Sequence, residues 1–168
     1  MAANAECKVL TVADVALDDL VSLLGKYGLE LVIEDDGAPI TGSFWGDPEA
    51  GVVSRTIYVR GDTPVHSLLH ESCHVICMTA DRRDSLNRDA GGDDLEEAAV
   101  CYLQVVLADC IAAVGRDRLM QDMDAWGYSF RLGSTRKWFW HDAEEALEFL
   151  INQRLLTESG EPTYVLRL

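Results

Sequence analysis

Hydrophobic and polar positions follow two different periods along this chain, and the change of period separates predicted helices from predicted strands. Residues 14–27 carry apolar side chains at helical spacing and stop near Gly25 and Gly28. Residues 29–33 form a short apolar run before an Asp-Asp-Gly turn, which predicts a strand. Residues 52–60 are rich in β-branched side chains and alternate throughout, so we expect one continuous strand there.

A helix is predicted to follow this second strand. Thr63 can cap the first free N–H groups, and Pro64 suits the first helical position. Residues 81–94 are polar and end in a Gly-Gly turn, after which Asp93 or Asp94 is expected to cap the next helix.

The remaining pattern is mostly helical. The nearly all-apolar run 95–115 predicts a central helix, and residues 117–126 predict a third. Asp142 and Glu145 form a capping box for a last helix at 143–155. The tail 162–168 is expected to be a strand or a docked extension. We therefore predict one α+β domain spanning 1–168, with a small sheet packed on the helix after 63.

Charge narrows the classes of partner. The chain has 29 acidic and 14 basic residues, a net charge of −15, and this much negative charge repels nucleic-acid phosphates and anionic membranes. No apolar run approaches the roughly 20 residues that a transmembrane helix needs, and the N-terminal residues lack the pattern of a signal peptide. We expect a cytoplasmic protein that binds neither nucleic acid nor membrane; its oligomeric state stays open.

The five cysteines are also consistent with a cytoplasmic protein. Cys7, Cys73, Cys77, Cys101 and Cys110 are odd in number and contain no C-x-x-C spacing, which disfavours a disulfide framework and predicts reduced thiols.

The stretch LLHESCH, residues 68–74, carries the main candidate chemistry. His70 and His74 are four residues apart, so both imidazoles can approach one point on one helix face. That spacing suits a tetrahedral zinc ion, and Glu71, one residue round the helix, can reach a water on the open side of the ion. In a chain of this composition the expected number of chance matches is about 0.007.

These residues resemble the H-E-x-x-H motif of the zincin metallopeptidases. No glycine-histidine extension follows His74, so the gluzincin pattern fits better, with a third ligand from a glutamate on the next helix. The segment from Glu96 to Tyr102 is similar to that helix in small bacterial gluzincin-like enzymes, although Val100 stands where they carry Asn or Asp. The resemblance implies a zincin-like fold, one Zn²⁺ per chain, and Glu71 as the catalytic base in peptide-bond hydrolysis.

Glu96 and Glu97 compete for the role of third ligand. Glu96 shares a face with Val100, Leu103 and Leu107, whereas Glu97 lies on the more polar side and could serve a helix cap. Because a ligand has to face inward, we predict Glu96 and keep Glu97 as the alternate.

Further groups are candidates for contacts with a substrate or its transition state. Tyr128 and Arg131 lie in a Gly-rich segment and could stabilise an oxyanion, and His66, one turn before His70, is predicted at the rim of the site. The strand 52–60 could pair with an extended peptide if it forms a sheet edge. His141, in an aromatic cluster, is expected only to pack at a helix start.

The sequence thus predicts a cytosolic zinc metallopeptidase that acts on peptides or proteins. The alternative is a catalytically inactive zinc-binding regulatory or interaction module on the same fold, and a third possibility is a metal-free interaction domain built around the aromatic C-terminal region. An intact Glu71 argues against the inactive module, because a structural zinc site needs no base.

Overall fold

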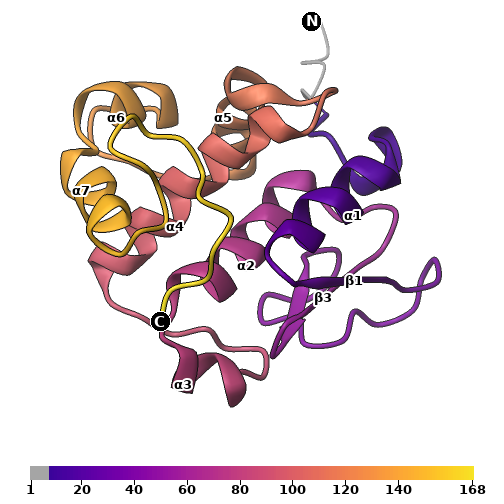
Figure 1. Cartoon of the computed structure of the whole chain (residues 1–168). Helices are drawn as coiled ribbons and strands as arrows, with labels where there is room; N and C mark the ends of the chain where they lie inside the picture. The colour runs from indigo at the N-terminus through magenta and orange to yellow at the C-terminus, as the bar shows by residue number, and fades with distance from the viewer. Residues whose placement is uncertain (1–7) are drawn as a thin grey trace, which may run out of the picture.

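A computed structural model describes residues 8–168, so Cys7 lies outside the described part (Figure 1). It confirms the α+β class. Two 3-10 turns, Val12–Asp14 and Ala108–Cys110, accompany these elements: α1 (Leu17–Lys26), β1 (Glu30–Ile33), β2 (Gly51–Val53), β3 (Thr56–Val59), α2 (Val65–Cys77), α3 (Ala80–Asp84), α4 (Asp94–Leu107), α5 (Gly115–Trp126), α6 (Thr135–His141) and α7 (Glu144–Asn152).

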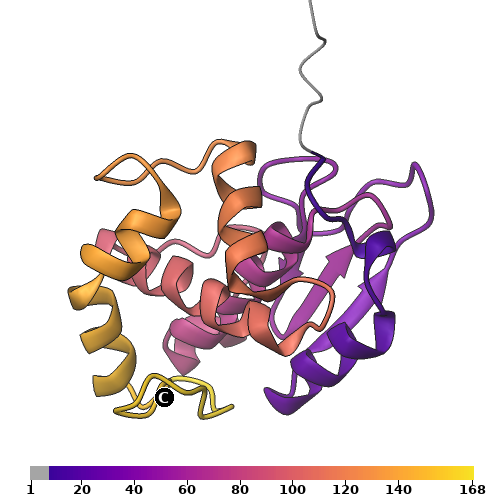
Figure 2. The ribbon, with the colours of Figure 1, turned by 90° about the horizontal axis from the view of Figure 1, so that it is seen from above.

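Helix α2 lies at the centre of the molecule. The sheet and α1 lie on one side of it, and α4 to α7 lie on the other (Figures 1 and 2). Nearly all of its side chains are buried, including those of His74 and Glu71. The buried apolar residues form one cluster that runs from Val12 to Leu156, and α2 passes through its middle. Polar groups on this helix therefore need partners inside the protein.

The predicted strand 52–60 is wrong in one respect, because it is a hairpin of two strands. β2 and β3 pair antiparallel with Val53 opposite Thr56, so Ser54 and Arg55 form a two-residue turn, and Ser54 has a φ of 52°. Val52, Ile57 and Val59 share the buried face, so the phase of the alternation changes at the turn. Because Val52 and Val53 are both apolar, the hydrophobic pattern does not reveal that change. β1 pairs parallel to β3, which makes β3 the central strand.

The hairpin offers no free edge for a peptide. β3 is paired on both sides, and the outer edge of β2 is already hydrogen-bonded to two loops. Val52 donates its N–H to Gly42 and accepts from Arg88, while Ser54 donates to Leu86. The predicted pairing of a substrate with this strand therefore has no place in the fold.

Several helix boundaries also differ from prediction. Pro64 occupies the cap position of α2, and Thr63 closes the preceding loop by accepting the Arg60 N–H. α4 ends at Leu107 and gives way to a 3-10 turn, so the predicted run 95–115 is too long. The short helices α3 and α6 lie in segments for which no helix was predicted.

The C-terminal tail is the docked extension that the sequence allowed. Arg167 donates its N–H to Ile76 and its guanidinium to the Cys77 carbonyl, at the end of α2. The buried Arg83 donates to the carbonyls of Val75, Met78 and Arg167. The tail, α3 and the end of α2 are thereby tied together.

Cys73, Cys77, Cys101 and Cys110 are free thiols, as predicted for the described cysteines. None of the helices within residues 8–168 is long and apolar enough to cross a membrane.

Candidate metal centre

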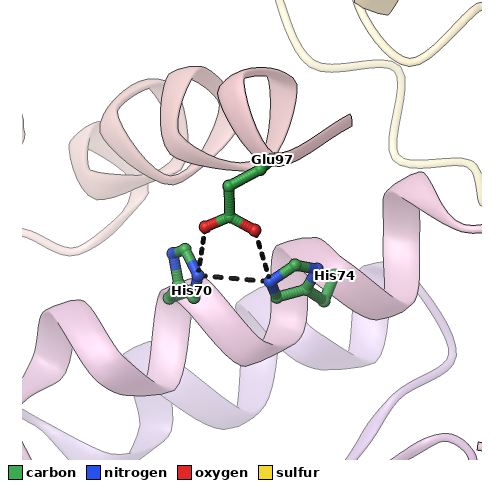
Figure 3. Close-up of side chains that lie close together, drawn as sticks. All are labelled: His70, His74 and Glu97. Atoms are coloured by element: carbon green, nitrogen blue, oxygen red, sulfur yellow. Dashed lines mark hydrogen bonds and ion pairs between the residues drawn. The ribbon is translucent and has the colours of Figure 1, made fainter. Parts of the chain in front are cut away.

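His70 and His74 present their imidazoles side by side on α2. Their Nε2 atoms are 3.2 Å apart and their ring centroids 4.8 Å apart (Figure 3). The four-residue spacing therefore produces the common point of approach that the sequence predicted. His74 is buried and His70 is nearly so.

Glu97 completes the group from α4. Its two carboxylate oxygens lie 3.0 Å from His70 Nε2 and 3.1 Å from His74 Nε2 (Figure 3). One ligand atom from each of the three residues lies within 4.8 Å of the others, so the group could hold a metal ion. Glu96, the predicted third ligand, does not lie in this group, and the alternate, Glu97, does.

Glu96 is buried as predicted, but it faces other partners. Its carboxylate accepts hydrogen bonds from Arg82 at 2.8 and 3.0 Å and lies 3.5 Å from the Arg167 guanidinium. Its N–H is bonded to the cap residue Asp93. The prediction failed because the histidines lie at the rim of a cleft, so the half-exposed side of α4 faces them rather than the interior side.

The charge of Glu97 suits a ligand. Burial by itself raises the pKa of Glu97, but hydrogen bonds from His70 and His74 hold it well below its ordinary value. The carboxylate therefore stays ionised over the whole physiological range, which is the form that binds a cation.

Glu71 is the second carboxylate of the centre, and it differs from Glu97 in its burial, its partners and the direction of its pKa shift. It is only 6% exposed, and it has no hydrogen bond or ion pair with any residue in 8–168. Burial raises its pKa, while the adjacent His70 and His74 oppose that rise. A buried carboxylate with a raised pKa and no partner is poised to accept and return a proton.

Gln104 determines which nitrogen of His70 is available. The Gln104 amide N–H₂ donates to the His66 carbonyl at 3.1 Å, which turns the amide oxygen toward His70 Nδ1 at 2.7 Å. His70 then carries a proton on Nδ1 and donates it to Gln104, so a metal ion would bind at Nε2, in place of the proton that Nε2 shares with Glu97. His74 lacks this support, since its Nδ1 is buried without a hydrogen-bond partner in the described chain.

Two cavities adjoin the centre and share His70, Glu71, Glu97 and Trp45 in their walls. One, of about 330 Å³, extends toward Glu49, Ser67 and the segment Trp126–Tyr128. The other, of about 260 Å³, extends toward Phe44, His74 and the loop 88–92. An extended molecule could thus pass over the histidines from one cavity into the other.

Of the three residues predicted to contact a substrate or its transition state, only Tyr128 lines a cavity beside the centre. Tyr128 lines the larger cavity, and its hydroxyl lies 3.2 Å from His66 Nδ1. His66 is buried behind Tyr128 and Trp126 rather than at the rim, because α2 turns that face toward α5. Arg131 is exposed and paired with Asp142, so it does not reach the centre.

The aromatic C-terminal region is mostly internal. Phe139 stacks on Tyr102 and Trp138 stacks on Phe130, and both α6 residues are buried. His141 ends α6 and is exposed, contrary to the expected packing at a helix start. Asp142 pairs with Arg131 instead of capping α7. These aromatic residues therefore build the core more than a docking surface.

Sequence reasoning missed the residues that shape the cleft. Trp45 and Glu49 come from the loop before β2, and Trp126 and Gln104 come from helices α5 and α4. The adjacent aromatics in the Gly-rich stretch ITGSFWGDPEAG were the available indication, because exposed aromatics in a loop often serve binding.

Comparisons with known proteins return nothing: no protein-family model matches the chain, and neither the curated proteins nor the solved structures contain a match. Inference about function therefore depends on the motif and on the geometry of these side chains.

Replacing Gln104 with Leu tests its role at the centre. The change removes the acceptor that holds the His70 proton, so zinc affinity is expected to fall by about 10–100-fold. A competition titration against a zinc-binding dye measures this, with the exposed Gln121→Leu as the matched control. Unchanged affinity in folded Gln104→Leu would contradict the role.

His66 gives a prediction about pH. Burial lowers its pKa to about 3, against an ordinary value near 6.5, so the unfolded chain binds the extra proton between these values and stability falls as the pH falls. In metal-free buffer, wild type should lose about 2 kcal/mol more unfolding free energy than His66→Gln between pH 7 and pH 5. Urea denaturation at both pH values measures this, and equal losses in the two proteins would refute it.

Proposed function

We propose that this chain is a zinc-dependent hydrolase of peptide bonds, the activity implied by its resemblance to the gluzincins. The observation that carries the proposal is a buried, unpartnered Glu71 beside the group of His70, His74 and Glu97. Two imidazoles and one carboxylate are the donor set of open, catalytic zinc sites.

The distances within the group support zinc. Ligand atoms roughly 2.0–2.1 Å from a tetrahedral ion lie about 3.3 Å apart. The Nε2 atoms of His70 and His74 are 3.2 Å apart, close to this value, and each lies 3.0 or 3.1 Å from a different oxygen of Glu97. The two cavities adjoin His70 and Glu97, and a substrate would lie in them.

Each residue of the chain has a distinct part in the proposed reaction. His70, His74 and Glu97 would hold a zinc ion, which when bound would supply Lewis acidity toward water and the substrate carbonyl. Glu71 accepts the proton of the attacking water and then donates it to the leaving amine. The Tyr128 hydroxyl, whose pKa burial raises to about 12, stays protonated and can donate a hydrogen bond in the larger cavity.

The proposal favours an enzyme over a zinc-stabilised binding module. A structural zinc is usually closed by four protein ligands, whereas the group identified within residues 8–168 offers three. An unpartnered buried carboxylate costs folding free energy, so its position beside the group is better explained by a reaction than by stability. We place the enzyme in the cytoplasm, where the free thiols of the described cysteines would persist.

The two adjacent glutamates give the sharpest test of the ligand set. Glu97→Gln should weaken zinc binding by more than the about 10–100-fold expected for an outer-shell partner, because a ligand is lost. Glu96→Gln should keep zinc but lose about 1–3 kcal/mol of unfolding free energy, since Arg82 and Arg167 lose their carboxylate. Elemental analysis after zinc dialysis and urea denaturation separate the two effects, and the opposite pattern would restore Glu96 as ligand.

Glu71→Gln tests catalysis without removing the metal. The variant keeps shape and loses basicity, so it should retain one zinc per chain and lose about 10²–10⁴-fold in the rate of peptide hydrolysis. The assay uses unfolded neutral or basic polypeptides, with Glu148→Gln, an exposed position on α7, as the control. A Glu71→Gln enzyme as fast as wild type would exclude the proposed base.

A further inference from the structure

The larger cavity beside the centre combines aromatic walls with a carboxylate. Its walls come from four segments of the chain: α2 with His70 and Glu71, α4 with Glu97, the loop before β2 with Trp45 and Glu49, and the end of α5 with Trp126 and Tyr128. Trp45 is 71% exposed and Trp126 is 41% exposed, so ring surface remains available to a bound molecule. Exposed tryptophan side chains that gather at one cavity are typical of a binding site.

Glu49 is held in position but is not neutralised. Its Oε1 accepts the Trp126 indole N–H at 2.7 Å, and no cation pairs with it among residues 8–168. The loop that carries it is fixed on both sides, since Ser43 donates to the Glu49 carbonyl and the next N–H, of Ala50, donates to Ser67 on α2. A carboxylate placed this firmly is preorganised for a ligand.

The residues that line the larger cavity favour a cationic ligand over an apolar or anionic one. An ammonium or guanidinium group can pair with Glu49 and lie against the indole rings, which attract cations through their faces. An apolar side chain would bury the charge of Glu49 without a cation to pair with it, which costs free energy. An anionic side chain would be repelled by Glu49, Glu71 and Glu97, which all line the cavity.

We propose that this cavity binds a cationic group of the substrate, so that the enzyme acts on peptides with a lysine or arginine side chain, or a free N-terminal amine, close to the bond that is cut. The position of the cationic group beside the bond that is cut rests on the proposed peptidase function, but the binding of a cationic peptide does not depend on hydrolysis. The net charge of −15 draws such peptides toward the protein as a whole.

The test measures binding to the Glu71→Gln variant, with and without zinc, by isothermal titration calorimetry. Four short peptides of one length are compared. Three are N-acetylated and C-amidated, with a central Lys, norleucine or Glu; the fourth is the norleucine peptide with a free N-terminus. The lysine peptide reports side-chain recognition, and the fourth peptide reports recognition of the terminal amine.

We expect the lysine peptide or the free-amine peptide to bind about fivefold to thirtyfold more tightly than the acetylated norleucine peptide, and the glutamate peptide to bind most weakly. The preference should shrink as salt concentration rises. Adding Glu49→Gln should reduce the cation preference to about twofold or less while the norleucine peptide binds as before, whereas adding Glu148→Gln should leave the preference intact.

The inference is overturned if norleucine binds as tightly as lysine and the free amine, if no peptide binds, or if the preference survives in Glu49→Gln. A cation preference without hydrolysis by the zinc-loaded wild type would overturn the peptidase proposal alone and leave the cation site standing. Hydrolysis without a cation preference would do the reverse.

Discussion

The candidate centre depends on how α4 lies across α2. On α2, His66, His70 and His74 form a stripe with one residue per turn, and on α4, Glu97, Cys101 and Gln104 form a matching stripe. The two stripes face each other: Glu97 meets His70 and His74 at one end, and Gln104 meets His70 and the His66 carbonyl at the other. Polar groups buried in an apolar interior must pair, and this packing is what pairs them.

The adjacent residues Glu96 and Glu97 contact different parts of the protein, because successive side chains of a helix point about 100° apart. Glu97 points to the cleft, while Glu96 is 4% exposed and points to Arg82 and Arg167. A buried carboxylate of this kind would be costly alone, and the two guanidinium groups offset that cost. Through Arg167 the docked C-terminal tail reaches the start of α4, so the tail helps to hold the helix that carries Glu97.

Three carboxylates line the cleft, and each lies in a different environment. Glu97 is kept ionised by the two histidines, Glu71 has its pKa raised by burial, and Glu49 is held by an indole N–H at the mouth of the larger cavity. These three positions suit three tasks in one proposed reaction: holding a metal, moving a proton and attracting a cationic substrate.

The sequence by itself determined what depends on neighbours along the chain. It placed His70 and His74 on one face of a helix, put Glu71 beside them, located the helix that supplies the third residue, and indicated a cap at Asp93. The face of the histidines, the place of Glu71 and the cap follow from helical geometry and local hydrogen bonding, which act over four residues. The helix of the third residue was indicated by the resemblance to the gluzincins. The docked tail was foreseen only as one of two options.

The tertiary structure alone decided which glutamate meets the histidines. The rotation of α4 against α2 is set by side chains far apart in sequence, including those of Arg82 and Arg167, and no pattern within α4 contains it. The hairpin at Ser54, the separation of Arg131 from the centre, and the cavity shared by Trp45, Glu49 and Trp126 were decided in the same way. Each depends on which surfaces pack together, and hydrophobic packing is not directional enough for a single chain pattern to specify it.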